Sequence, residues 1–90
     1  LVCPTCPIEA PPIAGVDETI SPLSSLTRAG NYLDLPAATV PCGLTAGGLP
    51  AGLQIMGGPA DEASVVTLAA AFERASGWNS QAPDLTAFAV

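Results

Sequence analysis

Residues 48–76, GLPAGLQIMGGPADEASVVTLAAAFERAS, determine the fold class that the sequence predicts. The apolar run at 49–57 is short and bounded by glycines, which is typical of a buried strand. Glycine and proline then interrupt the chain, Asp61 can cap a helix over 61–76, and Gly77 is placed to end it. A short strand followed by this helix is the best-formed unit that the sequence predicts. The apolar face expected for this helix comprises Val65, Leu68, Ala69, Phe72 and Ala75.

The sequence upstream of this unit predicts further strands and a short helix. Residues 36–43 are apolar and bounded by prolines, and a glycine-containing turn leads from them to the next strand, which favours an antiparallel hairpin. Residues 1–3 are typical of the end of a strand, and the proline-rich segment after them is expected to be an extended loop. Ser24 and Ser25 are candidate N-caps for the short helix. The expected division is a strand end and loop at 1–22, a helix at 23–34, the hairpin at 36–57, a helix at 61–76 and an irregular tail at 77–90, in which Leu85 and Phe88 cover a groove.

Composition limits the classes of protein to which the chain can belong. Ninety residues make at most one domain, and 11% charged residues are few beside the roughly 25% typical of a soluble domain. We therefore interpret the chain as a piece of a longer protein that folds poorly alone. The net charge of −6 argues against contact with nucleic acid or with anionic membrane surfaces. The chain has neither an apolar run of about 20 residues nor a signal peptide, and its odd cysteine count favours reduced thiols, so we expect a cytoplasmic protein.

Cys3 and Cys6 form a C-x-x-C pair that could serve in a metal site or a redox site. A zinc site needs two more ligands, and although Cys42 could supply one, the chain has no histidine. A redox pair belongs at a helix N-terminus, and the proline-rich segment that follows cannot form that helix. We therefore expect no metal and no cofactor, and we interpret the pair as small apolar thiols at the end of a strand.

No catalytic constellation is predicted within the chain itself. A nucleophilic serine or cysteine needs a base, and the sequence contains neither histidine nor lysine. Helix capping is the simpler role for the serines at 24–25, and burial at a strand end is the simpler role for Cys42. The adjacent acids Asp17 and Glu18 lie in a loop that we expect to be solvated, and Asn31 favours a structural role over contact with substrate.

Several motifs follow one another in a specific order from residue 26 onward. A threonine is followed four residues later by an asparagine, then by a Leu-Pro step, a strand that ends in Pro-x-Gly, a GLPxGxQ strand and a helix with an early glutamate. The residues concerned are Thr27, Asn31, Leu35, Pro36, Pro41, Gly43, Gly48, Pro50, Gly52, Gln54 and Glu62. Together with CPTCPIEAPPIAG at 3–15, this order resembles the C-terminal part of the amidase signature family. Asp34 stands where the family usually has glycine, which predicts a local turn without a positive φ.

The resemblance implies a fold and a division of roles. The family has an α/β fold, in which this region adds strands and a helix to a mixed central sheet sandwiched by helices, so the resemblance implies an α/β fold that is incomplete in this chain. Such proteins hydrolyse or transfer amide nitrogen with a Ser, a second Ser preceded by a cis peptide bond, and a Lys, which would all lie upstream of residue 1. The resemblance thus implies no catalytic residue here and an inactive isolated chain. Thr5 and Cys6 are expected to form part of the substrate-pocket wall.

Three interpretations of function are open at this point. The first is a piece of a hydrolase that acts on a small linear amide, with a homodimer of the parent protein as one arrangement. The second is a piece of the related amidotransferase component, which works in a complex, receives glutamine and supplies ammonia for charging tRNA. The third, of a different class, is a noncatalytic free-standing domain.

Overall fold

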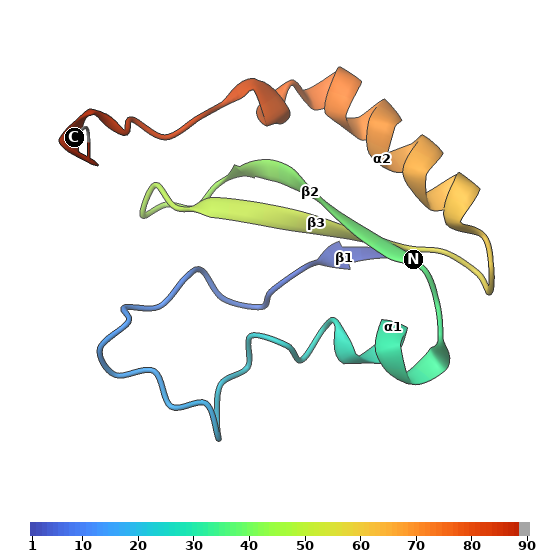
Figure 1. The fold of residues 1–90 in the computed structure, drawn as a ribbon, viewed down its shortest axis with the longest axis horizontal. Coiled ribbons are helices and arrows are strands. Elements are labelled where there is room, and N and C mark those ends of the chain that lie inside the picture. Colours follow the sequence, from blue (N-terminus) through green and yellow to red (C-terminus); the bar gives the residue numbers. More distant parts are fainter. Residues whose placement is uncertain (89–90) are drawn as a thin grey trace.

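Three strands form one antiparallel sheet with β3 at its centre (Figure 1). In the computed structural model, which describes residues 1–88, they are β1 (Val2–Pro4), β2 (Ala37–Leu44) and β3 (Pro50–Met56). A turn that contains Gly48 joins β2 to β3 as an antiparallel hairpin, and β1 pairs with the other edge of β3. This sheet and the helices that flank it confirm the predicted α/β class.

A bulge interrupts the pairing of β2 with β3. Pro41 pairs with Gly52 and Gly43 pairs with Ala51, so Cys42 is an extra residue in β2. Pro41 has no backbone donor, and it is tolerated because β2 is an edge strand. Bulges bend a strand and redirect its side chains. This bulge lies at the end of the sheet where the candidate site is found.

Helix α2 (Glu62–Ser76) covers one face of the sheet (Figure 1). As predicted, Asp61 is the N-cap, and its Oδ1 accepts a hydrogen bond from the Ser64 N–H at 3.2 Å. Gly77 adopts the left-handed conformation that ends the helix, with its N–H donating to the Glu73 carbonyl. Local sequence signals therefore set both ends of α2.

The hydrophobic core lies between α2 and the sheet. Its buried members are Val40, Ile55, Val65 and Ala69, with Ala38, Leu53 and Phe72 partly buried around them. The apolar face predicted for α2 is wrong at Leu68, which is 49% exposed, and at Ala75, which is also exposed. A small sheet covers only the stripe of positions i, i+4 and i+7, so side chains on its flank stay in solvent.

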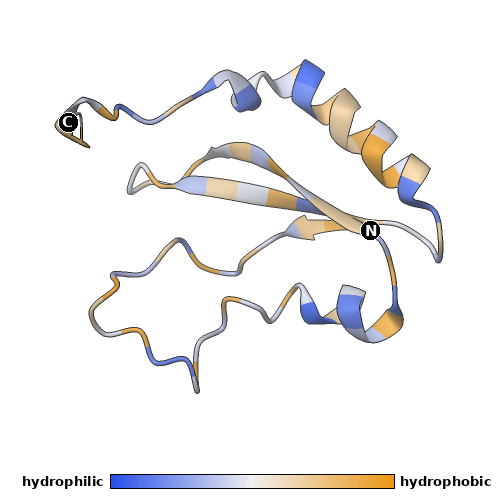
Figure 2. Cartoon of the chain, viewed as in Figure 1, coloured by the Kyte–Doolittle hydropathy of each residue, from blue (hydrophilic) through white to orange (hydrophobic). Residues whose placement is uncertain are grey.

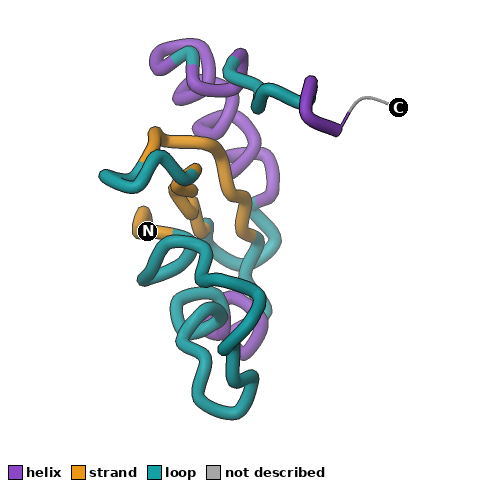
Figure 3. The backbone as a smooth tube through the Cα atoms, turned by 90° about the vertical axis from the view of Figure 1, so that its left-hand side faces the viewer, coloured by secondary structure: helices purple, strands orange, loops and turns teal. Residues whose placement is uncertain are grey.

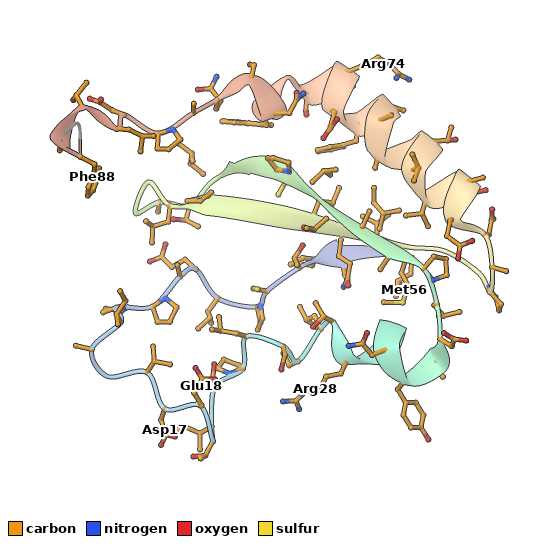
Figure 4. The ribbon with its side chains drawn as sticks, in the orientation of Figure 1. Asp17, Glu18, Arg28, Met56, Arg74 and Phe88 are labelled. Carbon is orange, nitrogen blue, oxygen red and sulfur yellow. The ribbon has the colours of Figure 1, made fainter. Side chains whose placement is uncertain are left out.

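Helix α1 (Arg28–Leu33) lies on the opposite side of the sheet from α2 (Figures 1 and 4). The Met56 side chain points toward this side, and its Cε atom lies 3.3 Å from the position that a Cβ atom on Gly30 would take. Gly30 is the buried residue of α1. The close approach of the helix to the sheet therefore depends on the missing side chain at this position.

The predicted start of the short helix, at 23–34 with a serine cap, is wrong. Thr27 is the N-cap, and it makes no side-chain capping hydrogen bond. Ser24 contributes its backbone carbonyl instead, which accepts from the N–H groups of Thr27 and Arg28 at 3.2 Å each. The turn before α1 satisfies these donors through the backbone, so the hydroxyls at 24–25 have no capping role.

The turn after α1 is a second correction. The sequence predicts no positive φ at Asp34, yet this residue is the C-cap of α1 at φ 55° and ψ 47°. Its N–H bonds to the carbonyls of Gly30 and Asn31, and the next residue, Leu35, donates to the Gly30 carbonyl at 2.9 Å. Aspartate tolerates the left-handed conformation better than most residues, which explains how it replaces glycine here.

Up to Phe88, the tail after α2 is extended apart from two short 3₁₀ turns, η1 (Trp78–Ser80) and η2 (Thr86–Phe88). The last two residues of the tail predicted at 77–90 lie outside the described residues. The predicted cover over a groove is wrong, because Leu85 is 62% and Phe88 is 76% exposed. Figures 1 and 3 show the tail running away from the end of α2, with Phe88 far from the core in Figure 4. Trp78 is the tail residue that packs on the sheet, where its ring fills the space beside Gly43.

The chain exposes more surface than a closed domain of its mass. Its accessible surface is 6556 Å², whereas a folded monomer of this size exposes about 4,800 Å². The radius of gyration is 15.1 Å, against about 12 Å for a compact domain of 90 residues. Figure 2 shows hydrophobic residues spread along the loop that follows β1, outside the core. Poor folding of these residues alone stays a prediction, which the large exposed surface supports.

Among residues 1–88, no helix is long and apolar enough to cross a membrane.

Candidate functional site

A cavity of about 810 Å³ lies between the proline-rich segment and the sheet. Residues 2–11 form one wall, the other wall comes from β2, β3 and the turn between them, and Leu23 adds to the lining from the segment before α1. We call this space the loop–sheet cavity. Most of its lining is aliphatic or proline, which suits a small organic ligand with few polar groups. The polar side chains of the lining are Thr5, Glu9, Thr39 and Thr45, with the thiols of Cys3, Cys6 and Cys42.

Two threonine hydroxyls meet in the lining of the loop–sheet cavity. The Oγ1 atoms of Thr5 and Thr39 lie 2.5 Å apart in a hydrogen bond, and either can be the donor. The backbone N–H of Thr5 also donates to the Gly52 carbonyl at 2.9 Å. A Cβ atom on Gly52 would lie 2.8 Å from the Thr39 oxygen and 2.9 Å from the Thr5 oxygen. Only glycine at position 52 therefore leaves room for the two hydroxyls to meet.

Glu9 fastens the proline-rich segment to the β2–β3 turn. The Thr45 hydroxyl donates to Glu9 Oε2, and Thr45 Oγ1 in turn accepts from the Leu49 N–H at 3.2 Å. A Cβ atom on Gly47 would lie 3.3 Å from the carboxylate. Glu9 is thus both an anchor for the loop and the charged side chain of the cavity lining.

Gln54 supports the cavity from within the sheet. It is 4% exposed, and its Nε2 donates to the Leu26 carbonyl at 2.9 Å and to the Cys3 sulfur at 3.2 Å. These bonds join the central strand to the segment before α1 and to β1. Leaving a buried partner of this amide unpaired would cost about 1–3 kcal/mol. The Gln54 side chain therefore holds β1 and the segment before α1 against the central strand.

The three cysteines are free thiols that approach the cavity from different elements. Cys42, the extra residue of the bulge, donates from its sulfur to the Ala51 carbonyl at 3.5 Å. Cys3 accepts from Gln54, and Cys6 is exposed. Within residues 1–88, no three His, Cys, Asp or Glu side chains come together in an arrangement that could hold a metal ion.

The acids Asp17 and Glu18 lie at the far turn of the loop, away from the sheet (Figure 4). The Thr19 hydroxyl and then the Thr19 N–H donate to Asp17 Oδ1, at 2.6 and 2.9 Å, and these bonds hold the pKa of that carboxyl below its ordinary value. The lowered pKa means that these bonds favour the charged form of Asp17. Its position away from the sheet gives it no role in the cavity.

The structure places the residues singled out from the sequence in two groups. Thr5 and Cys6 line the loop–sheet cavity, together with Pro50 and Gly52 of the motif. The other motif residues lie outside the lining, in the elements around it. They are Thr27 and Asn31 in or beside α1, Pro41 and Gly43 at the bulge, Gly48 in the turn, and Gln54 in the buried centre of β3.

Sequence reasoning missed Thr39, Glu9 and Thr45 as parts of the lining. Strand alternation was the available signal for Thr39, since it places this residue on the opposite face from Ala38 and Val40, which pack toward α2. No local signal pairs Glu9 with Thr45, because 36 residues separate them. That contact depends on the path of the whole loop.

Comparison with known proteins gave a family match and many relatives. The family model described as Amidase matches residues 1–66. Three of the most similar relatives are each named as the A subunit of a glutamyl-tRNA(Gln) amidotransferase. The protein from Thermosynechococcus vestitus is 38% identical over 90 residues, and that from Chloroflexus aggregans is 40% identical over 88 residues, each match covering 94% of this chain and 18% of the relative. The protein from Myxococcus xanthus is 42% identical over 79 residues, covering 82% of this chain and 16% of the relative. The chain thus spans about a fifth of the length of these relatives, and no solved structure matches it.

Proposed function

The chain belongs to the amidase family, and from this premise we propose that the loop–sheet cavity is one wall of a site at which a longer parent protein breaks the C–N bond of a carboxamide. The observation that carries this proposal is the extent of the family match. Residues 1–66 include every residue of the cavity lining, from Val2 to Leu53. The mainly apolar lining with a few hydroxyls suits a small-molecule amide as the ligand. The family match argues against an unrelated noncatalytic domain.

In this proposal the chain supplies the wall and the rest of the parent supplies the chemistry. The sequence has no histidine and no lysine, the residues that commonly activate a serine or cysteine nucleophile, so we assign no nucleophilic role to the exposed Ser24 or to the thiol of Cys42. The two Ser and the Lys that the resemblance implies would belong to the part of the parent that this sequence does not include. The hydroxyls of Thr5 and Thr39, together with Cys6 and Glu9, would then form the wall of the substrate site opposite those catalytic residues.

Two reactions fit this site, hydrolysis of an amide and transfer of its nitrogen. The names of the relatives favour transfer within a complex of several subunits, and the family resemblance adds glutamine as the nitrogen donor. The net charge of −6 leaves this chain without the basic surface that tRNA phosphates require, so we propose that a partner holds the tRNA. A homodimer of the parent and a cytoplasmic location, where free thiols persist, stay predictions.

The test begins with the full-length parent protein, purified alone and together with its candidate partner subunits. Ammonia release is measured with glutamine and with simple carboxamides, and amidation of glutamyl-tRNA is measured in the presence of the partners. We expect the parent together with its partners to transfer nitrogen from glutamine to glutamyl-tRNA, and we expect no ammonia release from the 90-residue chain alone. Amidation that requires the partners identifies the transferase, whereas ammonia release from simple carboxamides by the parent alone, without amidation, identifies the hydrolase. A parent that turns over no amide in any combination would overturn the proposal.

A further inference from the structure

We infer that the hydroxyl pair of Thr5 and Thr39 is the element of the loop–sheet cavity that recognises the primary carboxamide group of a substrate. This inference rests on the proposed function and adds to it a binding role for two named side chains. It also gives Gly52 a role in recognition, as the residue that makes room for the pair.

The position of the pair in the sheet is unusual because the two threonines come from opposite edges. Thr5 follows β1 and Thr39 lies in β2, while β3 runs between these strands. Their oxygens meet above Gly52 of β3, where a Cβ atom would lie under 3.0 Å from both. Both threonines line the cavity, and Thr39 is exposed. The hydroxyls are therefore held in a fixed arrangement that a ligand can reach.

The hydrogen-bonding capacity of the pair matches a primary carboxamide. Two hydroxyls carry two O–H donors and about four lone pairs, and their mutual bond uses one donor and one lone pair. One O–H is left to donate to the amide carbonyl, and the other lone pairs can accept from the amide N–H₂ group. An ester with the same acyl group offers only the carbonyl. Loss of the N–H···O bond on going from amide to ester is the basis for discrimination.

The Thr45 hydroxyl and the Cys42 thiol, which also line the cavity, are already engaged. Thr45 donates its hydroxyl proton to Glu9 and accepts from the Leu49 N–H. The Cys42 sulfur donates to the Ala51 carbonyl. Among the hydroxyls of the described lining, the Thr5–Thr39 pair is the one that keeps a free donor beside free acceptors.

Carboxamide recognition by Thr5 and Thr39 can be tested by measuring ligand binding to the full-length parent, independently of turnover. Benzamide, glutamine and methyl benzoate are titrated into the wild-type protein and into the Thr5→Val and Thr39→Val variants, which replace each hydroxyl by a methyl group of similar size. We expect benzamide to bind about tenfold more weakly to each variant, equivalent to ~1.4 kcal/mol, and methyl benzoate to change less than about twofold. Thr39→Ser keeps the hydroxyl and should therefore bind benzamide about as well as the wild-type protein does. Thr67→Val on the exposed outer face of α2 is the matched control and should change neither ligand.

Gly52→Ala tests the geometry without removing a hydroxyl. The new methyl group must push the two oxygens apart, so benzamide should lose affinity while methyl benzoate keeps most of it. Equal losses for benzamide and methyl benzoate, or no loss for benzamide, would overturn the inference. Failure of benzamide and glutamine to bind the wild-type protein would also overturn it. Selective loss of benzamide binding in a parent without amide turnover would support the inference and contradict the proposed function.

Discussion

Two regions of the chain are held together by different forces. The sheet–helix unit, residues 37–76, contains the buried hydrophobic side chains found among residues 1–88, from Val40 to Ala69. The proline-rich segment, residues 5–27, instead leaves Ile8, Ile13 and Ile20 exposed, and single polar contacts fasten it to the sheet. Burial of hydrophobic side chains therefore stabilises the sheet–helix unit, whereas hydrogen bonds hold the proline-rich segment against the sheet. The candidate site lies where the two regions meet.

The largest difference between the regions should appear when an isoleucine is truncated in each. Ile55 is 3% exposed in the centre of the core, and Ile13 is 97% exposed in the loop. We expect Ile55→Ala to lower the free energy of unfolding by about 2–5 kcal/mol, because it removes buried methyl groups and leaves a cavity. Ile13→Ala should change it by less than about 0.5 kcal/mol. Urea denaturation of the full-length protein measures both, and equal effects would show that the loop isoleucine is covered in the parent.

Gln54 links the two regions through its bond to the Leu26 carbonyl, so its replacement should loosen the segment before α1 without loosening α2. We expect Gln54→Leu to cost about 1–3 kcal/mol in stability, because the Leu26 carbonyl loses its partner. Hydrogen exchange should also speed up at residues 24–28 more than in α2, since the segment before α1 loses its tie to β3. Gln81→Leu, at an exposed position of the tail, is the control and should leave both quantities unchanged. Uniform exchange changes across the chain would contradict a linking role.

The sheet–helix unit could be predicted from the sequence because its signals are local. Asp61 and Gly77 bound α2 by capping, and glycines and prolines bound the two strands of the hairpin. The stripe that α2 buries was harder to predict, as Leu68 shows, because it depends on the width of the sheet beneath it. The end of α1 could not be predicted either. Aspartate at position 34 gives no clear signal for a positive φ, although the structure requires one there.

The lining of the loop–sheet cavity could be anticipated only on its loop side. Thr5 and Cys6 could be named from a resemblance, and they line this cavity, while their role in a substrate pocket stays a prediction. Thr39, which supplies the second hydroxyl, lies 34 residues from Thr5 in the sequence. The need for glycine at position 52 can be inferred only when the strand order is known, because β3 lies between the two threonines. Contacts across a sheet depend on the register of all three strands, which no local pattern specifies.

The C-cap of α1 offers a smaller effect of opposite sign. Asp34 adopts a left-handed conformation that glycine enters without steric cost. We expect Asp34→Gly to raise the stability by about 0.5 kcal/mol, because relief of strain outweighs the greater freedom of glycine in the unfolded chain. Ala29→Gly, inside the same helix, should instead lower it by about 1 kcal/mol. Thermal unfolding of the full-length protein would record both, and destabilisation by Asp34→Gly would mean that the carboxylate itself stabilises this turn.

The smallest expected effect separates two exposed carboxyls, Asp17 in the loop and Asp84 in the tail. The pKa of each lies below its ordinary value of 3.8. The Thr19 hydroxyl is the main cause for Asp17, whereas the Thr86 N–H is the main cause for Asp84. Thr19→Val should therefore raise the pKa of Asp17 more than Thr86→Val raises that of Asp84, because valine keeps the backbone donor. NMR titration of the two carboxyl carbons measures both.

The sign of the accompanying pH effect follows from the direction of these shifts. A carboxyl whose pKa is lower in the folded state stabilises that state at pH values above 3.8, and the contribution disappears as the pH falls through the folded pKa. The loop around Asp17 should therefore loosen only in strong acid, and Thr19→Val should move that loosening to higher pH. If both threonine variants shift their aspartates equally, the hydroxyl has no special role. The turn at Asp17 would then depend mainly on its backbone contact, as the turn at Asp84 does.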